Sequence, residues 1–210
     1  PKLIHNCIAI AAAPKLTAQN IAFNEIARQA IMKDPNWHNG NYLEKGVMPN
    51  QGLSLARMLG HITYLSDESM REKFGRDLKN SKLGFNYDVE FQIESYLRYQ
   101  GEKFVTGFDA NTYLLMTKSL DYYDPVKDMS DNLIKNLHEC QSNFLILSFT
   151  SDWRFPPKRS KEIVKLLLDN KRNVSYSEIS AEGGHDAFLM DNKDYFDVMA
   201  SFIMESNNGI

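Results

Sequence analysis

Three short apolar segments are spaced along the chain, and longer amphipathic segments separate them. The apolar segments are residues 4–11, 143–150 and 173–179, and their length and composition predict strands. Residues 4–11 are nearly all apolar, which is typical of a strand buried on both faces of a parallel sheet. Three strands are few for a chain with this much helix. We therefore expect four or five further strand–helix units ahead of residue 4, on the order of 150 residues at roughly 30 per unit.

The amphipathic segments carry apolar residues at spacings of three and four, which predicts helices. Thr17 or Asn20 is a candidate N-cap for the first helix, which is expected to run to Ile31 and to end at Asp34-Pro35-Asn36. Residues 37–51 are rich in Asn, Gly and Pro, so they are expected to form a loop. Two later helices are expected over residues 157–170 and 193–205.

Residues 53–137 form a long block whose pattern is helical throughout. One helix is expected to begin at Ser66 with a capping-box arrangement, and others are expected over residues 89–97 and 110–123. A parallel sheet ordinarily has one short crossover at this place. We interpret the block as a helical lid over the carboxyl edge of the sheet, where ligands bind in open α/β folds.

The expected organisation therefore has three parts. Residues 1–52 hold a core strand, a helix and a loop; residues 53–142 form the lid; and residues 143–210 return to the α/β core.

The composition narrows the class of protein. With 210 residues, of which 43% are hydrophobic and 24% charged, the chain resembles an average soluble globular protein. Its net charge of −3 argues against a nucleic-acid-binding surface, and no apolar run approaches the length that crosses a bilayer. No secretory signal is recognisable. Cys7 and Cys140 fit no metal or redox spacing, and two plain thiols suit a reducing compartment, so we expect a cytoplasmic location.

An acid and a histidine follow two successive predicted strands. Asp152 lies two residues beyond the strand at 143–150, and His185 comes after the strand at 173–179. This is the order in which an α/β-hydrolase presents the last two members of a Ser…Asp…His triad. Taken singly, such an Asp is usually a turn former and a Gly-His is usually a loop residue, but the ordered pair favours catalysis.

The nucleophile of such a triad is not in this chain, because no Gly-x-Ser-x-Gly elbow occurs in the sequence. We therefore interpret the chain as the carboxyl-terminal part of an α/β-hydrolase fold with a large helical lid insertion. Its amino-terminal strands and nucleophile elbow are expected on preceding polypeptide. The chain alone is expected to be catalytically inactive, because loss of the nucleophile removes most of the catalytic effect.

The other histidines indicate no further site. His5 is expected in a strand interior, His38 in a polar loop and His138 on a helix, and His61 is expected to pack or to form a hydrogen bond. No pair of them has metal-ligand spacing with a nearby acid or cysteine, so no metal site is expected.

Several long motifs carry a resemblance that covers nearly the whole chain. On these motifs the chain resembles the homoserine O-acyltransferases of methionine biosynthesis. The motifs lie at residues 13–25, 55–66, 94–101, 108–113, 151–153 and 184–189. The resemblance implies an α/β-hydrolase fold with a helical lid and a homodimer formed through that lid. It also implies a ping-pong reaction in which a serine takes an acyl group from acyl-CoA and the hydroxyl of homoserine removes it. Acyl-CoA is a co-substrate in this reaction, and no cofactor is expected.

The resemblance also implies roles for individual residues. Asp152 and His185 correspond to the triad acid and base. Arg57 corresponds to the arginine that binds the homoserine carboxylate, and Tyr64 and Asp186 to the other substrate contacts, Asp186 facing the amino group. A zwitterionic amino acid suits a guanidinium and a carboxylate. Without the resemblance, a lid salt bridge would be the preferred interpretation of Arg57.

Arg154 bears on the choice of acyl group. Acetyl-transferring relatives often have an apolar residue two places after the triad acid, where this chain has a cation. A buried terminal carboxylate of succinyl-CoA would be costly without a partner, and Arg154 would supply one. The Asp-Trp-Arg-Phe sequence also resembles the succinyl-using branch, so succinyl transfer is favoured and acetyl transfer remains the alternative.

Two other functions fit parts of the pattern. An α/β-hydrolase esterase would transfer the acyl group to water, and a non-catalytic helical interaction module would use the lid alone. The proposed contacts of Arg57, Tyr64 and Asp186 favour an amino-acid acceptor, and serine or another small hydroxy amino acid stays open beside homoserine.

Overall fold

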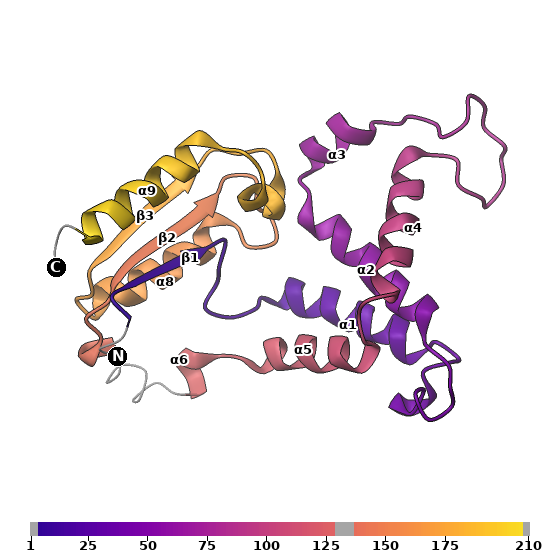
Figure 1. The fold of residues 1–210 in the computed structure, drawn as a ribbon, viewed down its shortest axis with the longest axis horizontal. Coiled ribbons are helices and arrows are strands. Elements are labelled where there is room, and N and C mark those ends of the chain that lie inside the picture. The colour runs from indigo at the N-terminus through magenta and orange to yellow at the C-terminus, as the bar shows by residue number, and fades with distance from the viewer. Residues whose placement is uncertain (1–3, 129–136, 208–210) are drawn as a thin grey trace. The chain divides into compact units, whose positions relative to one another are not determined.

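The computed structural model describes residues 4–128 and 137–207, and the chain divides into two compact units (Figure 1). Unit 1 comprises Pro1–Lys15, Tyr64–Ser66 and Asp124–Ile210, and unit 2 comprises Leu16–Thr63 and Asp67–Tyr123. The predicted helical block extends over residues 129–136, which lie outside the described residues. The division into parts at 1–52, 53–142 and 143–210 stays a prediction.

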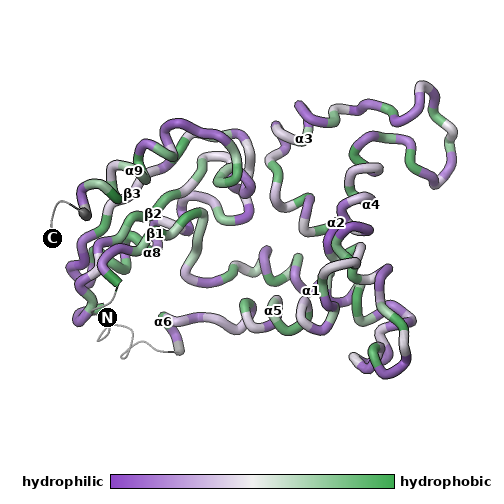
Figure 2. Tube along the Cα trace, viewed as in Figure 1, coloured by the Kyte–Doolittle hydropathy of each residue, from purple (hydrophilic) through white to green (hydrophobic). Residues whose placement is uncertain are grey.

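Unit 1 is built on a parallel sheet of three strands in the order β1-β2-β3. The strands are β1 (Asn6–Ile10), β2 (Asn143–Phe149) and β3 (Val174–Ile179). All three predicted strands and the parallel arrangement are thus confirmed. Figure 2 shows the apolar character of β2, whose residues from Leu145 onward are buried. Burial on both faces was wrong for β1, which is half-buried because, among the described strands, it lies at the edge and pairs with β2 alone.

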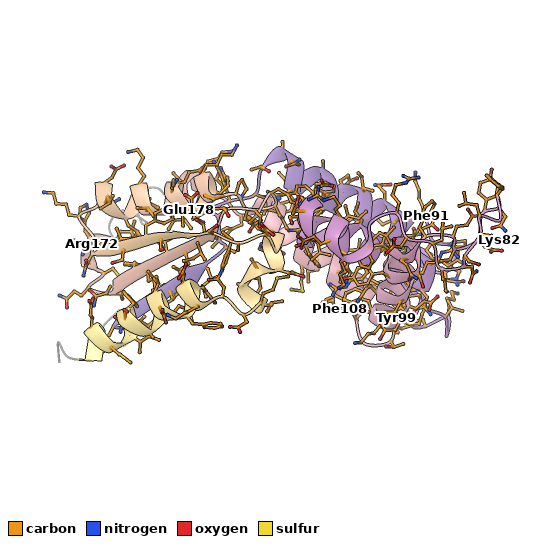
Figure 3. The ribbon with its side chains drawn as sticks, turned by 90° about the horizontal axis from the view of Figure 1, so that it is seen from above. Lys82, Phe91, Tyr99, Phe108, Arg172 and Glu178 are labelled. Atoms are coloured by element: carbon orange, nitrogen blue, oxygen red, sulfur yellow. The ribbon has the colours of Figure 1, made fainter. Side chains whose placement is uncertain are left out.

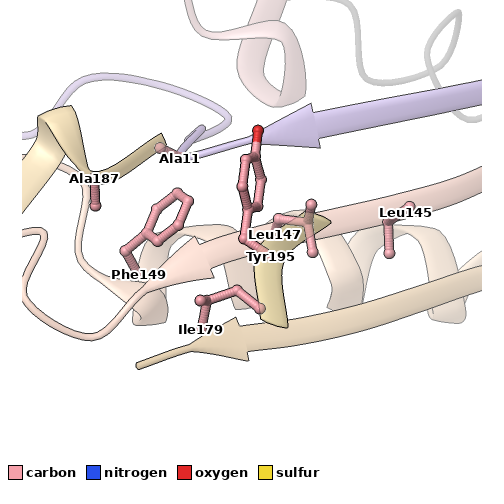
Figure 4. Close-up of a cluster of buried hydrophobic side chains, with 7 residues drawn as sticks. All are labelled: Ala11, Leu145, Leu147, Phe149, Ile179, Ala187 and Tyr195. Atoms are coloured by element: carbon pink, nitrogen blue, oxygen red, sulfur yellow. The ribbon is translucent and has the colours of Figure 1, made fainter. Parts of the chain in front are cut away.

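Two helices cover the opposite faces of this sheet, as Figures 1 and 3 show. They are α8 (Pro157–Asp169) and α9 (Lys193–Asn207), both close to their predicted positions. Pro157 occupies the first turn of α8, where a missing N–H costs nothing. On the α9 side, Phe149 of β2 packs against Tyr195 with ring centroids 5.4 Å apart. The buried cluster there (Figure 4) consists of Ala11, Leu145, Leu147, Phe149, Ile179, Ala187 and Tyr195.

Two short elements complete unit 1. The four-residue helix α6 (Pro125–Asp128) precedes the undescribed residues, and the 3₁₀ helix η2 (Gly184–Leu189) follows β3. His5 was predicted in a strand interior, which is wrong: it precedes β1 and is exposed. Its backbone carbonyl accepts the N–H of Asn143 at 2.8 Å, which extends the sheet by one bond.

Unit 2 is helical. Thr17 is the N-cap of its first helix, as predicted: its hydroxyl accepts the N–H of Asn20, and the Asn20 side chain accepts the N–H of Thr17. The helix ends before Asp34-Pro35, also as predicted. A buried ion pair of 2.7 Å between Arg28 and Asp121 joins the first and last of these helices. The elements are α1 (Ala18–Met32), η1 (His38–Gly40), α2 (Asn50–Tyr64), α3 (Asp67–Phe74), α4 (Gln92–Val105) and α5 (Ala110–Tyr122).

The helical pattern predicted from residue 53 to 137 is wrong between α3 and α4. Residues 75–91 form a loop with one isolated antiparallel bridge between Leu78 and Phe91. Gly75 has a φ of 50°, and a left-handed residue at this place ends a helix. Asn, Asp and Gly each occur twice in the loop. Asn and Asp favour turns because their side chains compete for backbone hydrogen bonds, and Gly does so because it adopts left-handed backbone conformations.

His61 has the structural role predicted for it. Its Nδ1 lies 3.2 Å from the hydroxyl of Tyr96, and the residue is buried. Desolvation by burial, assisted by the nearby charges of Arg57 and Lys73, lowers the pKa of His61 to about 4. The imidazole is therefore neutral at physiological pH and holds α2 against α4.

Among the described residues, no helix combines the length and apolar character that crossing a bilayer requires.

Gly52 on α2 lies close to the backbone of α1. A Cβ at this position would lie 2.6 Å from Ile31 Cα and would also meet the carbonyl of Ala30. The backbone N–H of Gly52 donates to Asp34 Oδ2 at 2.8 Å, so the helix cannot easily move away.

We expect Gly52→Ala to destabilise the chain by about 1–3 kcal/mol, because overpacking against backbone forces the two helices apart. Gly107→Ala is the matched control, because a Cβ at Gly107 would meet nothing within 4 Å. It should change stability by less than about 0.5 kcal/mol. The urea midpoints of the two variants measure the difference, and equal midpoints would contradict the close approach.

Candidate active site

The candidate site lies at the carboxyl edge of the sheet in unit 1. Because β2 and β3 are parallel neighbours, the loops that follow them meet at the same edge. The loop after β2 carries Asp152, and η2 after β3 carries His185. The two residues predicted from the strand order are thus brought together.

Asp152 and His185 form a direct hydrogen bond of 2.8 Å between Oδ2 and Nδ1. Asp152 is 1% exposed, so its carboxylate depends on protein partners in place of water. Its other oxygen, Oδ1, accepts the backbone N–H of Phe155 at 2.8 Å. Both oxygens are therefore occupied, and the direction of the bond to the imidazole is fixed.

The ring of His185 is enclosed by aromatic side chains. The centroids of Phe155, Phe188 and Tyr64 lie 5.0, 5.9 and 6.4 Å from its own. Because Nδ1 bonds a carboxylate, it carries the proton, and Nε2 is left as the basic nitrogen. Within the described part of the chain, Nε2 has no hydrogen-bond partner, and the side chain is 19% exposed. The arrangement suits a general base that accepts a proton at Nε2.

Short polar side chains join the two loops. Thr150 Oγ1 donates to the carbonyl of Ala181 and accepts its N–H, both at 3.1 Å. Ser151 Oγ accepts the N–H of Gly184 at 2.9 Å. Gly184 has a φ of 71°, a conformation in which glycine carries no steric penalty. The residues next to Asp152 and His185 therefore set the backbone conformation that brings these two side chains together.

Arg154 and Tyr64, both predicted site residues, lie beside this pair. The guanidinium of Arg154 is 5.5 Å from the ring centroid of Tyr64 and 5.7 Å from that of Phe155. A cation over an aromatic face is attracted by the ring quadrupole. Asp186, the remaining predicted contact in unit 1, follows His185 in η2 and is half-buried.

Arg57, the predicted carboxylate ligand, belongs to unit 2. It lies on α2 with its guanidinium 4.7 Å from the ring centroid of Phe104. The two residues line a cavity of about 280 Å³. The other lining residues are Gln100, Lys103, Gly107 and Phe108.

Three site residues were missed by the sequence reasoning: Phe155, Phe188 and Trp153. Phe155 and Phe188 enclose the imidazole, and Trp153 Nε1 donates to the carbonyl of Leu65 at 3.0 Å. Each lies within three residues of the acid or the histidine, so proximity in sequence was the available signal. Over the described residues, no group of three His, Cys, Asp or Glu side chains is placed to hold a metal ion.

Known proteins resemble this chain closely in sequence. It is 60% identical to the homoserine O-succinyltransferase of Hydrogenovibrio crunogenus over 205 residues, which are 97% of this chain and 53% of that protein. The chain spans about half the length of the curated relatives it matches. No protein-family model matches it. The resemblance to homoserine O-acyltransferases that the motifs indicated is confirmed.

Solved structures establish the fold. The homoserine O-acetyltransferase from Bacillus anthracis has a TM-score of 0.77 at 20% identity, over 90% of this chain and 51% of that one. Esterase E22 has a TM-score of 0.77 at 19% identity, over 96% of this chain and 54% of that one. The predicted α/β-hydrolase fold class is confirmed.

The bond between Asp152 and His185 gives a prediction that is independent of any substrate. A proton held between an imidazole and a buried carboxylate should resonate far downfield in the proton NMR spectrum. We expect the chain to show this line and Asp152→Asn to lose it, because the amide offers no charged acceptor. Asp197→Asn is the matched control, since Asp197 forms an exposed ion pair with Lys193 on α9. A line that persists in Asp152→Asn would contradict the assignment.

Proposed function

We propose that this chain is the part of a homoserine O-acyltransferase that supplies the acid and the base of a Ser–His–Asp triad. The reaction moves an acyl group from acyl-CoA, with succinyl-CoA favoured, to the hydroxyl of L-homoserine. The observation that carries the proposal is the 2.8 Å bond between Asp152 and His185 in a chain that is 60% identical to a homoserine O-succinyltransferase.

His185 performs the proton transfers in this mechanism. Its Nε2 takes the proton from the serine hydroxyl, and the serine oxygen attacks the thioester carbonyl of acyl-CoA. The imidazolium then gives its proton to the departing CoA thiolate. In the second half, Nε2 takes the proton of the homoserine hydroxyl, whose oxygen attacks the acyl-serine carbonyl. The ester bond to the serine then breaks, and the imidazolium returns the proton to the departing serine oxygen. Asp152 stabilises the imidazolium in both halves and holds its tautomer.

The serine and the donors that stabilise the oxyanion are supplied by polypeptide outside this chain. Support comes from the absence of a Gly-x-Ser-x-Gly elbow in the sequence and from the 53% share of the relative's length that the chain matches. The half-buried edge of β1 offers backbone groups that a further parallel strand would satisfy.

The family resemblance supplies the proposed roles in substrate recognition. Arg57 binds the carboxylate of homoserine, Asp186 its ammonium group, and Tyr64 provides a further contact. Arg154 binds the terminal carboxylate of the succinyl group. Phe155 contacts both His185 and Arg154, with centroid distances of 5.0 and 5.7 Å, so the cation lies close to the place where the acyl group reacts.

The resemblance extends this proposal to the setting of the enzyme. It supports a homodimer formed through the helical lid at residues 53–142, a place in methionine biosynthesis and a cytoplasmic location. The reaction needs acyl-CoA as co-substrate and no resident cofactor or metal.

The first test joins this chain to the part of the Hydrogenovibrio crunogenus protein that it does not match; we call the product the joined protein. It should release thiol from succinyl-CoA continuously only when homoserine is present, and without homoserine it should release about one thiol per active site as the acyl-serine forms. The chain alone should release none. Asp152→Asn and His185→Ala should each lower kcat/KM by about 10³-fold or more, because the triad acts as a unit. Asp197→Asn and His5→Ala are exposed matched controls and should retain activity.

Each outcome of this test has a meaning. Continuous thiol release without homoserine would indicate an esterase-like transfer to water. A higher kcat/KM with serine than with homoserine would identify serine as the acceptor. Activity that survives both triad substitutions, or turnover by the chain alone, would contradict the mechanism.

The second test concerns the acyl group. In the joined protein, Arg154→Leu should lower the ratio of kcat/KM for succinyl-CoA over acetyl-CoA by about 10- to 100-fold, because a hydrogen bond to a charged group contributes about 1.5–3 kcal/mol. Lys158→Leu removes an exposed cation of the same segment and should leave the ratio unchanged. An equal ratio in Arg154→Leu would refute the succinyl assignment.

A further inference from the structure

The last residue of α2 and the two residues that connect α2 to α3 belong to unit 1, although the helices on either side belong to unit 2. The chain leaves unit 2 after Thr63 and returns to it at Asp67. Between them lie Tyr64, Leu65 and Ser66, which we call the 64–66 segment. Leu65 is 6% and Ser66 7% exposed, so the segment is buried against its neighbours in unit 1.

The segment is bonded to the loop that carries the acid. Trp153, the residue directly after Asp152, donates its indole N–H to the carbonyl of Leu65 at 3.0 Å. A buried carbonyl needs such a partner, and the bond restrains the loop at the position next to the acid.

The segment also contacts the loop that carries the histidine. Ser66 Oγ donates to the carbonyl of Glu182, the residue ahead of Gly183 and Gly184. A Cβ on Gly184 would lie 2.5 Å from Ser66 N and 2.7 Å from both Leu65 C and Tyr64 O. The backbones of the two segments are therefore in direct contact at Gly184, the residue immediately before His185.

Two consecutive glycines before the histidine make this contact important. Glycine has the widest range of backbone conformations, so Gly183-Gly184 is the joint at which His185 could most easily shift away from Asp152. The 64–66 segment contacts Glu182, the residue ahead of the joint, and Gly184, the second residue of the joint. A displacement of about 1 Å in a catalytic group can cost about 10²-fold in rate.

We propose that the 64–66 segment positions the Asp152–His185 pair through two positioning residues, Ser66 on the segment itself and Trp153 on the loop that carries the acid. It holds the acid loop and the histidine loop in register, so that Nδ1 and Oδ2 stay within bonding distance. The kinetic part of this inference rests on the proposed acyl transfer; the geometric part does not.

The alternative is that the loops position themselves. Ser151 Oγ accepts the N–H of Gly184 at 2.9 Å, and Thr150 bonds Ala181, so the strand ends already join the two loops. Under this alternative, loss of a single hydrogen bond to the 64–66 segment would lower the stability of the protein and leave the Asp152–His185 contact unchanged.

The experiment removes single donors in the joined protein. Ser66→Ala deletes the hydroxyl, Ser66→Thr retains it, and Trp153→Phe deletes the indole N–H while keeping an aromatic ring. Two matched controls make the same changes elsewhere. Trp37→Phe removes an indole that donates to Asn111 at 3.2 Å on unit 2, and Ser119→Ala removes an exposed hydroxyl that bonds the carbonyl of Leu115.

We expect Ser66→Ala and Trp153→Phe to lower kcat by about tenfold through misplacement of the base, with both KM values unchanged within error. The downfield proton line of His185 should broaden or shift in the same two variants. Ser66→Thr and both controls should keep the wild-type kcat and the wild-type line.

The proposal is overturned if both variants keep the wild-type line and kcat, whatever their melting temperatures. It is also overturned if both variants fail to fold, because the segment would then be a folding element. If one variant fails to fold, the other decides. If the wild-type joined protein transfers no acyl group, the proposed function fails separately, and the downfield line still decides whether the segment positions the pair.

Discussion

A buried carboxylate sets the geometry of the candidate site. Asp152 is 1% exposed, and an ionised carboxylate removed from water is costly unless hydrogen bonds replace its hydration. Those bonds come from two directions, from the N–H of Phe155 and from the imidazole of His185. The orientation of the histidine is therefore determined by the requirements of the acid as well as by the rings around it.

The sheet supplies what this interaction needs. Where parallel strands end, some backbone N–H and C=O groups have no partner on a neighbouring strand. Short hydroxyl side chains can form hydrogen bonds with these groups. Thr150 and Ser151 do so after β2 by bonding Ala181 and Gly184 in the loop after β3. These hydrogen bonds join the two loops independently of Asp152 and His185. The 2.8 Å contact between Asp152 Oδ2 and His185 Nδ1 therefore rests on segments that are already held together.

The sequence determined the elements that depend on local patterns. Apolar runs located β1, β2 and β3, and the order of Asp152 and His185 after two parallel strands located the pair. Contacts between segments that are far apart in the sequence could not be predicted from it. Nothing local shows that the carbonyl of Leu65 meets Trp153, or that β1 lies at an edge. The loop at 75–91 was missed because its apolar residues imitate helical spacing while Gly75 and the residues after it favour turns.

Phe155 contacts three residues with different proposed roles: Asp152, His185 and Arg154. Its backbone N–H holds Asp152, its ring lies 5.0 Å from that of His185, and the same ring lies 5.7 Å from the guanidinium of Arg154. A substitution at position 154 that displaces the ring of Phe155 therefore also alters the packing around the imidazole. Under the proposed acyl transfer, a change of acyl preference at this position must leave Phe155 in place so that the imidazole keeps its alignment. The proposed donor selectivity and the orientation of His185 are thus coupled through one aromatic residue.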